Sequence, residues 1–291
     1  MAIRWHEDDP AMLATAVRFT AAGTEFLPEQ VEKDYFGSVL LEYLGEQHDG
    51  LTFKGGTALS KVHAGFFRLS EDLDFTISTA LDASRADRRR DSDRLKKAVA
   101  ALPRSLPAFH LITPLRGANE STQYITTLGY RSVVDGQEQS ISIEVGLREP
   151  LLTDPYHGAA QTLLQHPLTR LPLVPPFRVR CLSRDETMAE KLRAALCRRE
   201  VAIRDFFDLD HLARRGVLRP DDGALLALVR QKVKIPGTGA VDTSEERMGQ
   251  LAAQIEGALR PVLRPSEFAE FDLNRAIEIV RLVGRGVAPP Q

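Results

Sequence analysis

A short segment with strict alternation of apolar and polar side chains places the strongest constraint on how this chain folds. The segment runs from Glu71 to Ser78, and its apolar residues Leu73, Phe75 and Ile77 alternate with Asp72, Asp74, Thr76 and Ser78. Successive side chains of a β-strand point to opposite faces of a sheet, so a period of two is typical of a strand with one buried face. The fold must therefore contain a sheet, and one face of this strand carries two carboxylates.

The residues on the N-terminal side of this strand predict helices and a second strand. Apolar residues recur at helical spacing through residues 1–50, most clearly from Phe26 to Leu44. Leu51–Lys54 is a short predicted strand that leads into Gly55-Gly56-Thr57. A brief helix is expected from Ala58 to Ala64, with Gly65 as its C-cap.

The residues that follow predict a charged helix and then a β-hairpin. The helix is expected at about 83–101, and the arms of the hairpin at Tyr124–Val134 and Glu138–Leu147. Asp135-Gly136 lies between the arms and suits a tight primed turn. Alternation in the second arm places Glu144 on a polar strand face.

The rear of the chain has a different pattern, which predicts a second domain. A proline-rich passage from Pro150 to Pro176 is expected to be irregular and to contain the boundary. Phe177–Leu182 is a predicted strand, and Ser183 with Glu186 fits a capping box that opens a helix. Helical patterns continue to the end. The predicted fold class is α+β, with a mixed-sheet domain at 1–176 and a mostly helical domain at 177–291.

Composition excludes several classes of protein. The chain is 43% hydrophobic and 27% charged, and it has no run of roughly 18–20 apolar residues of the kind that crosses a membrane. The N-terminal residues do not resemble a secretory signal, and two cysteines make neither a disulfide framework nor a metal site. We therefore expect a cytoplasmic protein with no membrane partner, and a monomer as the default state.

Charge gives a weaker indication of partners. The formal net charge is −2, so the whole chain is not a basic nucleic-acid binder. One segment is rich in cations, which are Arg85, Arg88, Arg89, Arg90, Arg94, Lys96 and Lys97. Aspartates alternate with them, which favours a solvated helix face with ion pairs over a surface that contacts phosphates.

Two polar features near the alternating strand indicate phosphate chemistry. The turn Lys54-Gly55-Gly56-Thr57 joins a strand to a helix, where glycine allows close approach and free N–H groups favour anions. It lacks the Gly-Lys-Ser/Thr end of a P-loop. Asp72 and Asp74 lie roughly 7 Å apart on one strand face. That spacing suits ligands of a pair of divalent cations, although a solvent-exposed strand face is the alternative.

Glu144 extends this pattern if its strand pairs with the strand that carries Asp72 and Asp74. Three carboxylates without a cation between them would repel one another, so their gathering makes sense when metal neutralises them. A lone glutamate on a strand would otherwise be an ordinary surface residue.

These features, in this order, resemble the AbiEii/AbiGii-type nucleotidyltransferase toxins, which include the MenT group and are polymerase-beta-like enzymes. The resemblance rests on four stretches between residues 30 and 210, which are Val31–Phe36, Gly55–Lys61 with Arg68–Phe75, Ile143–Val145, and Lys191–Ala195 with Arg198 and Arg204–Leu209. One departure is Thr57, where polymerase-like relatives often have serine. Threonine keeps the hydroxyl.

The resemblance implies a role for each matching residue. Those implied to be catalytic are Asp72, Asp74, Glu144, Lys191 and Asp208, and Asp72, Asp74 and Glu144 would bind Mg²⁺, with Mn²⁺ as an alternative metal. Those implied to contact the nucleotide are Gly55, Gly56, Thr57, Lys61, Arg68, Ser70, Arg204 and Asp205. Lys191 and Asp205 are 14 positions apart and share a helix face if one helix joins them. The Arg204, Asp205 and Asp208 set is alternatively a structural ion-pair network.

The resemblance also implies a function. It predicts the toxin of a toxin–antitoxin pair, which moves a nucleoside monophosphate from an NTP to the 3′ acceptor end of tRNA and has a cognate antitoxin protein as partner. A group of arginines in the rear half supports an RNA acceptor in part; these are Arg178, Arg180, Arg184, Arg193, Arg198, Arg199, Arg204, Arg214 and Arg215. The alternatives are a protein or small-molecule hydroxyl as acceptor, or a non-catalytic module that binds RNA or protein.

Overall fold

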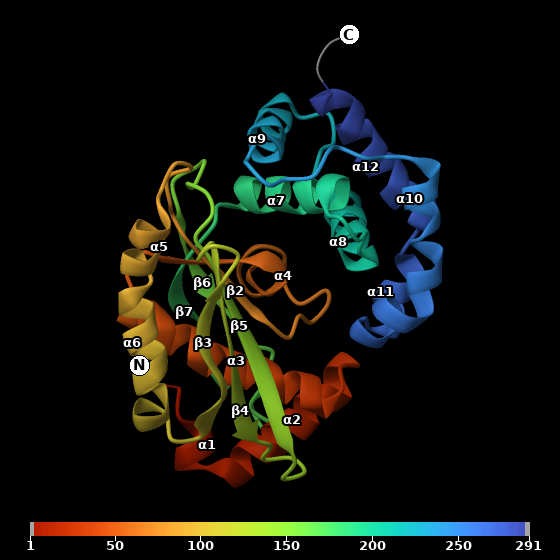
Figure 1. Ribbon diagram of the computed structural model, residues 1–291. Coiled ribbons are helices and arrows are strands. Elements are labelled where there is room, and N and C mark those ends of the chain that lie inside the picture. The colour runs from red at the N-terminus through yellow and green to blue at the C-terminus, as the bar shows by residue number, and fades with distance from the viewer. Residues whose placement is uncertain (1–2, 289–291) are drawn as a thin grey trace. The chain divides into compact units, whose positions relative to one another are not determined.

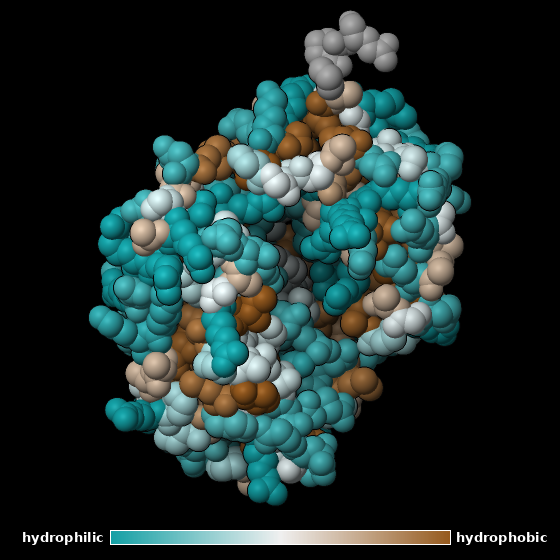
Figure 2. All heavy atoms as spheres, in the orientation of Figure 1, coloured by the Kyte–Doolittle hydropathy of each residue, from teal (hydrophilic) through white to brown (hydrophobic). Residues whose placement is uncertain are grey.

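The computed structural model describes residues 3–288 of the 291-residue chain. The chain divides into two compact units, of which unit 1 comprises 1–151 and 155–182, and unit 2 comprises 152–154 and 183–291. In the part of the chain that is described, none of the helices is both long and apolar enough to cross a membrane. Figure 2 shows one face of the molecule, on which hydrophilic residues predominate and hydrophobic ones are interspersed among them.

Unit 1 is built on a mixed seven-stranded sheet with the strand order β3-β4-β5-β2-β1-β7-β6 (Figure 1). Its strands are β1 (Leu51–Lys54), β2 (Leu73–Ile77), β3 (Phe109–Ala118), β4 (Gln123–Arg131), β5 (Glu138–Gly146), β6 (Tyr156–Ala160) and β7 (Phe177–Cys181). The pairs β2–β5 and β1–β7 are parallel, and the other neighbours are antiparallel. The predicted α+β class with a mixed sheet is therefore confirmed.

Helices cover the apolar face of this sheet. The helices of unit 1 are α1 (Trp5–Asp8), α2 (Pro10–Thr24), α3 (Pro28–Gln47), α4 (Gly55–Ala58), the π-helical η1 (Leu59–Ala64), α5 (Arg85–Asp91) and α6 (Asp93–Ser105). Phe36 of α3 packs on Tyr130 of β4, with ring centroids 4.1 Å apart. Phe75 and Val145 are also in this core, so one face of β2 and β5 is buried and their polar residues point to the other face.

Three local predictions differ from the structure. The charged helix at 83–101 is two helices, because Ser92 is buried between α5 and α6 and its hydroxyl donates to the carbonyl of Arg89. The hairpin loop spans 132–137, and only Gly136 of the Asp135-Gly136 pair has positive φ, so the predicted tight primed turn is wrong.

The third difference concerns the boundary between the units. The proline-rich passage from Pro150 to Pro176 contains β6, which pairs with β7 at the edge of the sheet. Because β7 also pairs with β1, Phe177–Cys181 is part of unit 1, and the division lies after Leu182 instead of after residue 176. An edge strand of low apolar content gains its stability from backbone pairing, which the sequence pattern does not reveal.

Unit 2 is helical apart from its short connecting segments. Its helices are α7 (Arg184–Cys197), α8 (Ile203–Arg214), α9 (Gly223–Val233), α10 (Glu245–Gly249), η2 (Ala252–Gln254), η3 (Ile255–Leu259), η4 (Arg260–Val262), α11 (Pro265–Glu270) and α12 (Leu273–Val287). Within this unit α7 packs against α9, and α8 packs against α12. Ser183 caps α7 by accepting the N–H of Glu186, but the Glu186 carboxylate instead binds Lys232 at 2.7 Å.

Candidate active site

Five side chains form one row across the polar face of the sheet in unit 1. The five residues are paired with one another across neighbouring strands. From β1 through β2, β5 and β4 to β3, they are Lys54, Asp74, Glu144, Ile125 and Arg116. Residues paired directly across neighbouring strands point to the same face, and each step along the row is about 4.8 Å. The row therefore places two carboxylates side by side, with a cationic residue at each end.

The central pair of this row depends on the parallel pairing of β2 with β5. Asp74 is in register with Glu144, and both residues are half-buried. The pairing that the sequence analysis required for Glu144 is therefore present. Asp72 lies one residue before β2 and is exposed, and strand alternation directs it to the same face as Asp74.

The Gly-Gly turn contacts the segment that carries Asp72 and Asp74 directly. Gly55 has a φ of +75°, and a Cβ at this position would lie 2.3 Å from Oδ2 of Asp74. The Thr57 hydroxyl donates a 2.6 Å hydrogen bond to the backbone carbonyl of Asp72. Only glycine allows the carboxylate of Asp74 to lie this close to the turn. The position of the turn and the position of the Asp74 carboxylate therefore depend on each other.

The start of α4 has features of an anion site. Its N-cap, Lys54, provides no side-chain hydrogen bond to the first turn. A Cβ at Gly56 would lie 2.7 Å from Nη2 of Arg68 and 3.3 Å from Oγ of Ser70. The N–H groups of a helix start together with a guanidinium favour a bound anion. Gly55, Gly56, Arg68 and Ser70 are therefore brought together, as the sequence analysis expected.

We expect Gly55→Ala to reduce nucleotidyl transfer by about 100-fold, because its Cβ would displace the Asp74 carboxylate by about an ångström. Gly65→Ala is a matched control, since Gly65 has a φ of +74° but nothing within 4 Å of an added Cβ. It should cost roughly 1–3 kcal/mol of stability, because Gly65 also has a ψ of 176° and this conformation is essentially confined to glycine, and it should leave the rate unchanged. Rates and thermal unfolding of both variants test this, and equal rates would contradict the proposed role of the turn.

Lys61 lies in the interior of unit 1 and not beside the turn. Its Nζ donates to Oδ1 of Asp34 at 2.6 Å and to the Ser38 hydroxyl at 2.7 Å, and its side chain is 1% exposed. Burial lowers the pKa of Lys61, while the charge of Asp34 opposes this shift. Because the ammonium is already enclosed by these partners, we do not retain Lys61 as a nucleotide contact.

In unit 2 the predicted residues of α7 and α8 form a compact ionic cluster. Nζ of Lys191 lies 3.0 Å from Oδ1 of Asp205 and 2.8 Å from Oδ2 of Asp208. Arg198 donates to the other oxygen of Asp205 at 3.1 Å. Residues 198–202 separate the two helices, so one helix does not join Lys191 to Asp205. Arg204 is exposed and lies outside these bonds.

This cluster fixes the direction of the Lys191 ammonium. The Lys191 side chain is 12% exposed and the Asp208 side chain is fully buried. Charge-assisted bonds to two carboxylates hold the ammonium in one position at the surface of unit 2. The arrangement serves equally as a cation for phosphate and as a structural ion-pair network, the two alternatives that the sequence left open.

The cysteines and His63 do not supply an alternative chemistry. Cys181 is fully buried, and burial raises the pKa of its thiol to about 11. Nε2 of His63 lies 3.0 Å from the carbonyl oxygen of Leu182. A buried neutral thiol is a poor nucleophile, so cysteine chemistry is not indicated.

The carboxylates meet the chemical requirements for Mg²⁺. Among residues 3–288, no group of three or more His, Cys, Asp or Glu side chains is placed so that it could hold a metal ion. Mg²⁺ in phosphoryl-transfer sites, however, is commonly held by one or two carboxylates with waters and substrate phosphates. Asp74 and Glu144, in register and directed to one face, provide such a donor pair, and Asp72 provides a third carboxylate nearby.

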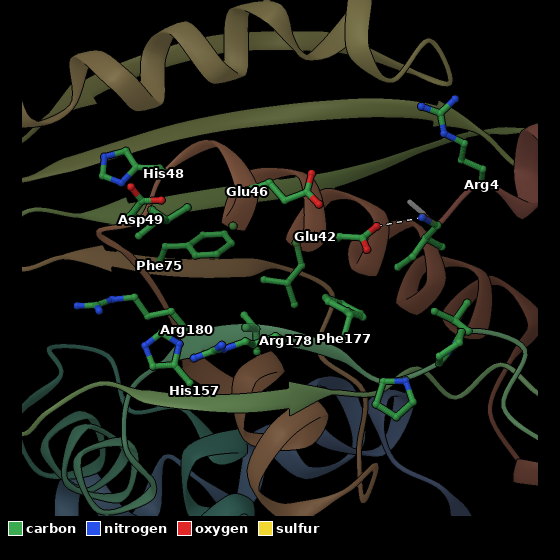
Figure 3. Close-up of a pocket in the computed structure, with 18 of the residues that line it drawn as sticks. Arg4, Glu42, Glu46, His48, Asp49, Phe75, His157, Phe177, Arg178 and Arg180 are labelled. Atoms are coloured by element: carbon green, nitrogen blue, oxygen red, sulfur yellow. Dashed lines mark hydrogen bonds between the residues drawn. The ribbon is translucent and has the colours of Figure 1, made fainter. Parts of the chain in front are cut away.

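A cavity of about 860 Å³ lies elsewhere in unit 1. Leu51 and Phe75 line it, and they belong to the sheet face opposite that of Lys54 and Asp74. Figure 3 shows Glu42, Glu46 and His48 at this cavity, with Glu42 accepting the N–H of Ile3 at 2.9 Å. None of the predicted site residues lines it, so we do not place the nucleotide there.

Three members of the row were not among the predicted site residues. The sequence did indicate that Lys54 could belong to the site, since it ends a predicted strand immediately before the Gly-Gly turn. Nothing in the sequence indicated Ile125 and Arg116 as site residues, because only the register of β3, β4 and β5 brings them beside Glu144.

A known family and several solved structures are similar to this chain. The family model described as the nucleotidyl transferase AbiEii toxin of the type IV toxin–antitoxin system matches residues 39–278, more than half of the chain. No curated protein matches.

Three solved structures share the fold. MenT4, a nucleotidyltransferase toxin from Mycobacterium tuberculosis H37Rv, is 19% identical with a TM-score of 0.59, and the alignment covers 95% of this chain and 99% of that one. A putative nucleotidyltransferase from H. pylori is 16% identical with a TM-score of 0.51, over 89% of this chain and 95% of that one. JHP933 from Helicobacter pylori is 16% identical with a TM-score of 0.50, over 90% and 93%.

The family match, with the fold shared by these structures, establishes the general activity: the chain belongs to the AbiEii family and is a nucleotidyltransferase toxin of a type IV toxin–antitoxin system.

Proposed function

We propose that this toxin is a Mg²⁺-dependent enzyme that transfers a nucleoside monophosphate from an NTP to the 3′ acceptor end of tRNA. A blocked 3′ end cannot be aminoacylated, so translation and growth would stop. The observation that carries the proposal is the register of Asp74 with Glu144 beside the Gly55 turn. The cognate antitoxin of the system is the proposed protein partner.

The proposed roles follow from the contacts of each residue. Asp72, Asp74 and Glu144 would hold the metal, which supplies charge neutralisation for the triphosphate and the leaving pyrophosphate. Gly55, Gly56 and the backbone N–H of Thr57 would hold phosphate oxygens, since the Thr57 hydroxyl is already bonded to Asp72.

Proton transfer and charge neutralisation complete the reaction. Glu144 would accept the proton of the acceptor hydroxyl, whose oxygen then bonds to the α-phosphorus as the bond to pyrophosphate breaks. Arg68 and Ser70 lie beside Gly56 and are further proposed contacts of the triphosphate. Arg68 is buried and donates to the carbonyl of Leu69, so a bound phosphate would have to reach the guanidinium through the Gly56 turn. Within unit 2, Asp205 and Asp208 hold the ammonium of Lys191. Lys191 and Arg204 are kept as proposed phosphate contacts on the resemblance alone.

The tRNA acceptor is supported by the resemblance to the MenT group and by the arginines of the rear half. Two other acceptors use the same metal site, namely a protein hydroxyl and a small-molecule hydroxyl. A non-catalytic binding module is disfavoured, because adjacent like charges on paired strands are destabilising. A module that only binds RNA or protein would have no use for the paired carboxylates.

Labelling separates these alternatives. The purified protein is incubated with total tRNA, Mg²⁺ and each α-labelled NTP in turn, beside the Asp74→Asn variant. We expect one NTP to label tRNA with the wild type only. Label on protein in a cell extract, but not on tRNA, would refute the tRNA acceptor and keep the metal site. Binding of Mg²⁺ and NTP without transfer to any acceptor would favour the binding module.

A further inference from the structure

Beyond Glu144, the row of paired residues continues onto an open part of the sheet. Ile125 of β4 is in register with Glu144, and Arg116 of β3 is in register with Ile125. Ile125 is 38% exposed and Arg116 is exposed. Two steps of about 4.8 Å separate Glu144 from Arg116, so the residues lie about 10 Å apart across the sheet.

The side chain of Arg116 makes no contact that stabilises the fold. Among residues 3–288 this side chain makes no hydrogen bond, ion pair or ring contact, and strand pairing directs it away from the helices that cover the other face of the sheet. Other cations near this end of the sheet have acidic partners, such as Arg85 with Glu120 at 3.6 Å and Arg90 with Asp87 at 2.5 Å. Arg116 is therefore a cation available to an external anion.

The order of the chemical groups along the row matches a strand of nucleic acid better than a polypeptide. A polynucleotide end presents a terminal hydroxyl, a ribose and base, and then a phosphate. The row presents a carboxylate, an exposed apolar side chain, and then a guanidinium. A guanidinium pairs with phosphate through two parallel hydrogen bonds. A polypeptide acceptor has a hydroxyl but no phosphate at the matching distance.

We propose that Ile125 and Arg116 form the binding surface for the acceptor strand of the RNA. The terminal ribose places its hydroxyl at Glu144, the sugar and base edge contact Ile125, and a preceding phosphate binds Arg116. This inference rests on the proposed function and adds the direction of the acceptor, from Asp74 towards β3. Both residues would thus act on RNA binding and not on NTP binding.

The test compares Arg116→Gln with Arg104→Gln in the tRNA-labelling reaction. Arg104 is an exposed arginine of α6 whose side chain makes no ion pair or hydrogen bond in residues 3–288, so it is a matched control. Arg116→Gln should raise the KM for tRNA about tenfold. The KM for NTP and kcat should not change. The slope of log(1/KM) against log salt concentration should weaken by about 0.7–0.9, the value of one phosphate contact.

Two further variants separate charge from geometry. Arg116→Lys keeps the charge, so it should keep the wild-type salt slope while losing part of the affinity. Ile125→Thr keeps the β-branched shape and should raise the KM for tRNA about threefold through the lost apolar contact. Circular dichroism checks that each variant is folded.

The possible failures are distinguishable. If the wild type labels tRNA but Arg116→Gln behaves like Arg104→Gln, the inference is overturned and the proposed function stands. If the wild type labels only protein, or nothing, the inference and the tRNA acceptor are overturned together.

Discussion

Asp74→Asn is expected to reduce nucleotidyl transfer at least about 1000-fold, equivalent to about 4 kcal/mol of transition-state stabilisation. The amide keeps the size of the side chain but removes the negative charge with which Asp74 would hold a divalent cation. The carboxylate is also the group against which Gly55 packs. The measurement is the rate of label transfer from an α-labelled NTP at saturating Mg²⁺.

The fold should survive this substitution. Asp74 and Glu144 are like charges paired directly across two strands, an arrangement that is itself destabilising. The free energy of unfolding should therefore change by less than about 1 kcal/mol. Asp82→Asn removes a charge from an exposed position after β2 and serves as the control. Retention of more than a tenth of the wild-type rate by Asp74→Asn would refute the metal site.

Lys61→Met is expected to destabilise the protein by about 3–5 kcal/mol, because it leaves Asp34 as an uncompensated buried charge. The Lys61 and Asp34 side chains are 1% and 4% exposed, and Oδ2 of Asp34 also accepts the N–H of Leu163 at 3.0 Å. The pair thus joins η1, α3 and the segment after β6. Urea unfolding followed by circular dichroism measures the loss.

Lys33→Met provides the comparison for this prediction. Lys33 pairs with Glu71 at the same 2.6 Å distance, but the two side chains are 18% and 49% exposed. An exposed pair of this kind contributes about 0–1 kcal/mol, so this variant should unfold almost as the wild type does. The double variant Asp34→Asn/Lys61→Met should recover part of the lost stability, since asparagine is uncharged and still accepts from Leu163. Equal losses of stability for Lys61→Met and Lys33→Met would show that burial does not determine how much the ion pair contributes to the free energy of unfolding.

Much of the fold could be predicted from the chain alone, where local patterns decide the structure. Strict alternation at Glu71–Ser78 predicts β2, and the apolar spacing from Phe26 to Leu44 predicts α3. The strand at Phe177–Cys181 was also predicted, although it was assigned to the wrong unit. The spacing of apolar residues indicates that a segment is a strand, but it does not indicate which strand lies beside it.

The same distinction explains the errors. β6 was missed because its residues Tyr156–Ala160 have no apolar alternation, and pairing with β7 alone makes them a strand. Lys61 was expected to contact the nucleotide because it belongs to the stretch Gly55–Lys61, on which the resemblance rests. The π-helical turn of η1 carries it into the interior, where Asp34 neutralises it. Sequence distance does not report the direction in which a side chain points.

Residue types and their spacing along the chain are enough to predict the groups of the candidate site. They predict a strand face with Asp72 and Asp74, a glycine turn before it, and a later strand with Glu144, because these depend on residue type and on periods of two or 3.6. Only the folded chain shows the register that sets Asp74 beside Glu144 and continues the row to Ile125 and Arg116. Register depends on the packing of a shared core over many residues, so no local pattern contains it.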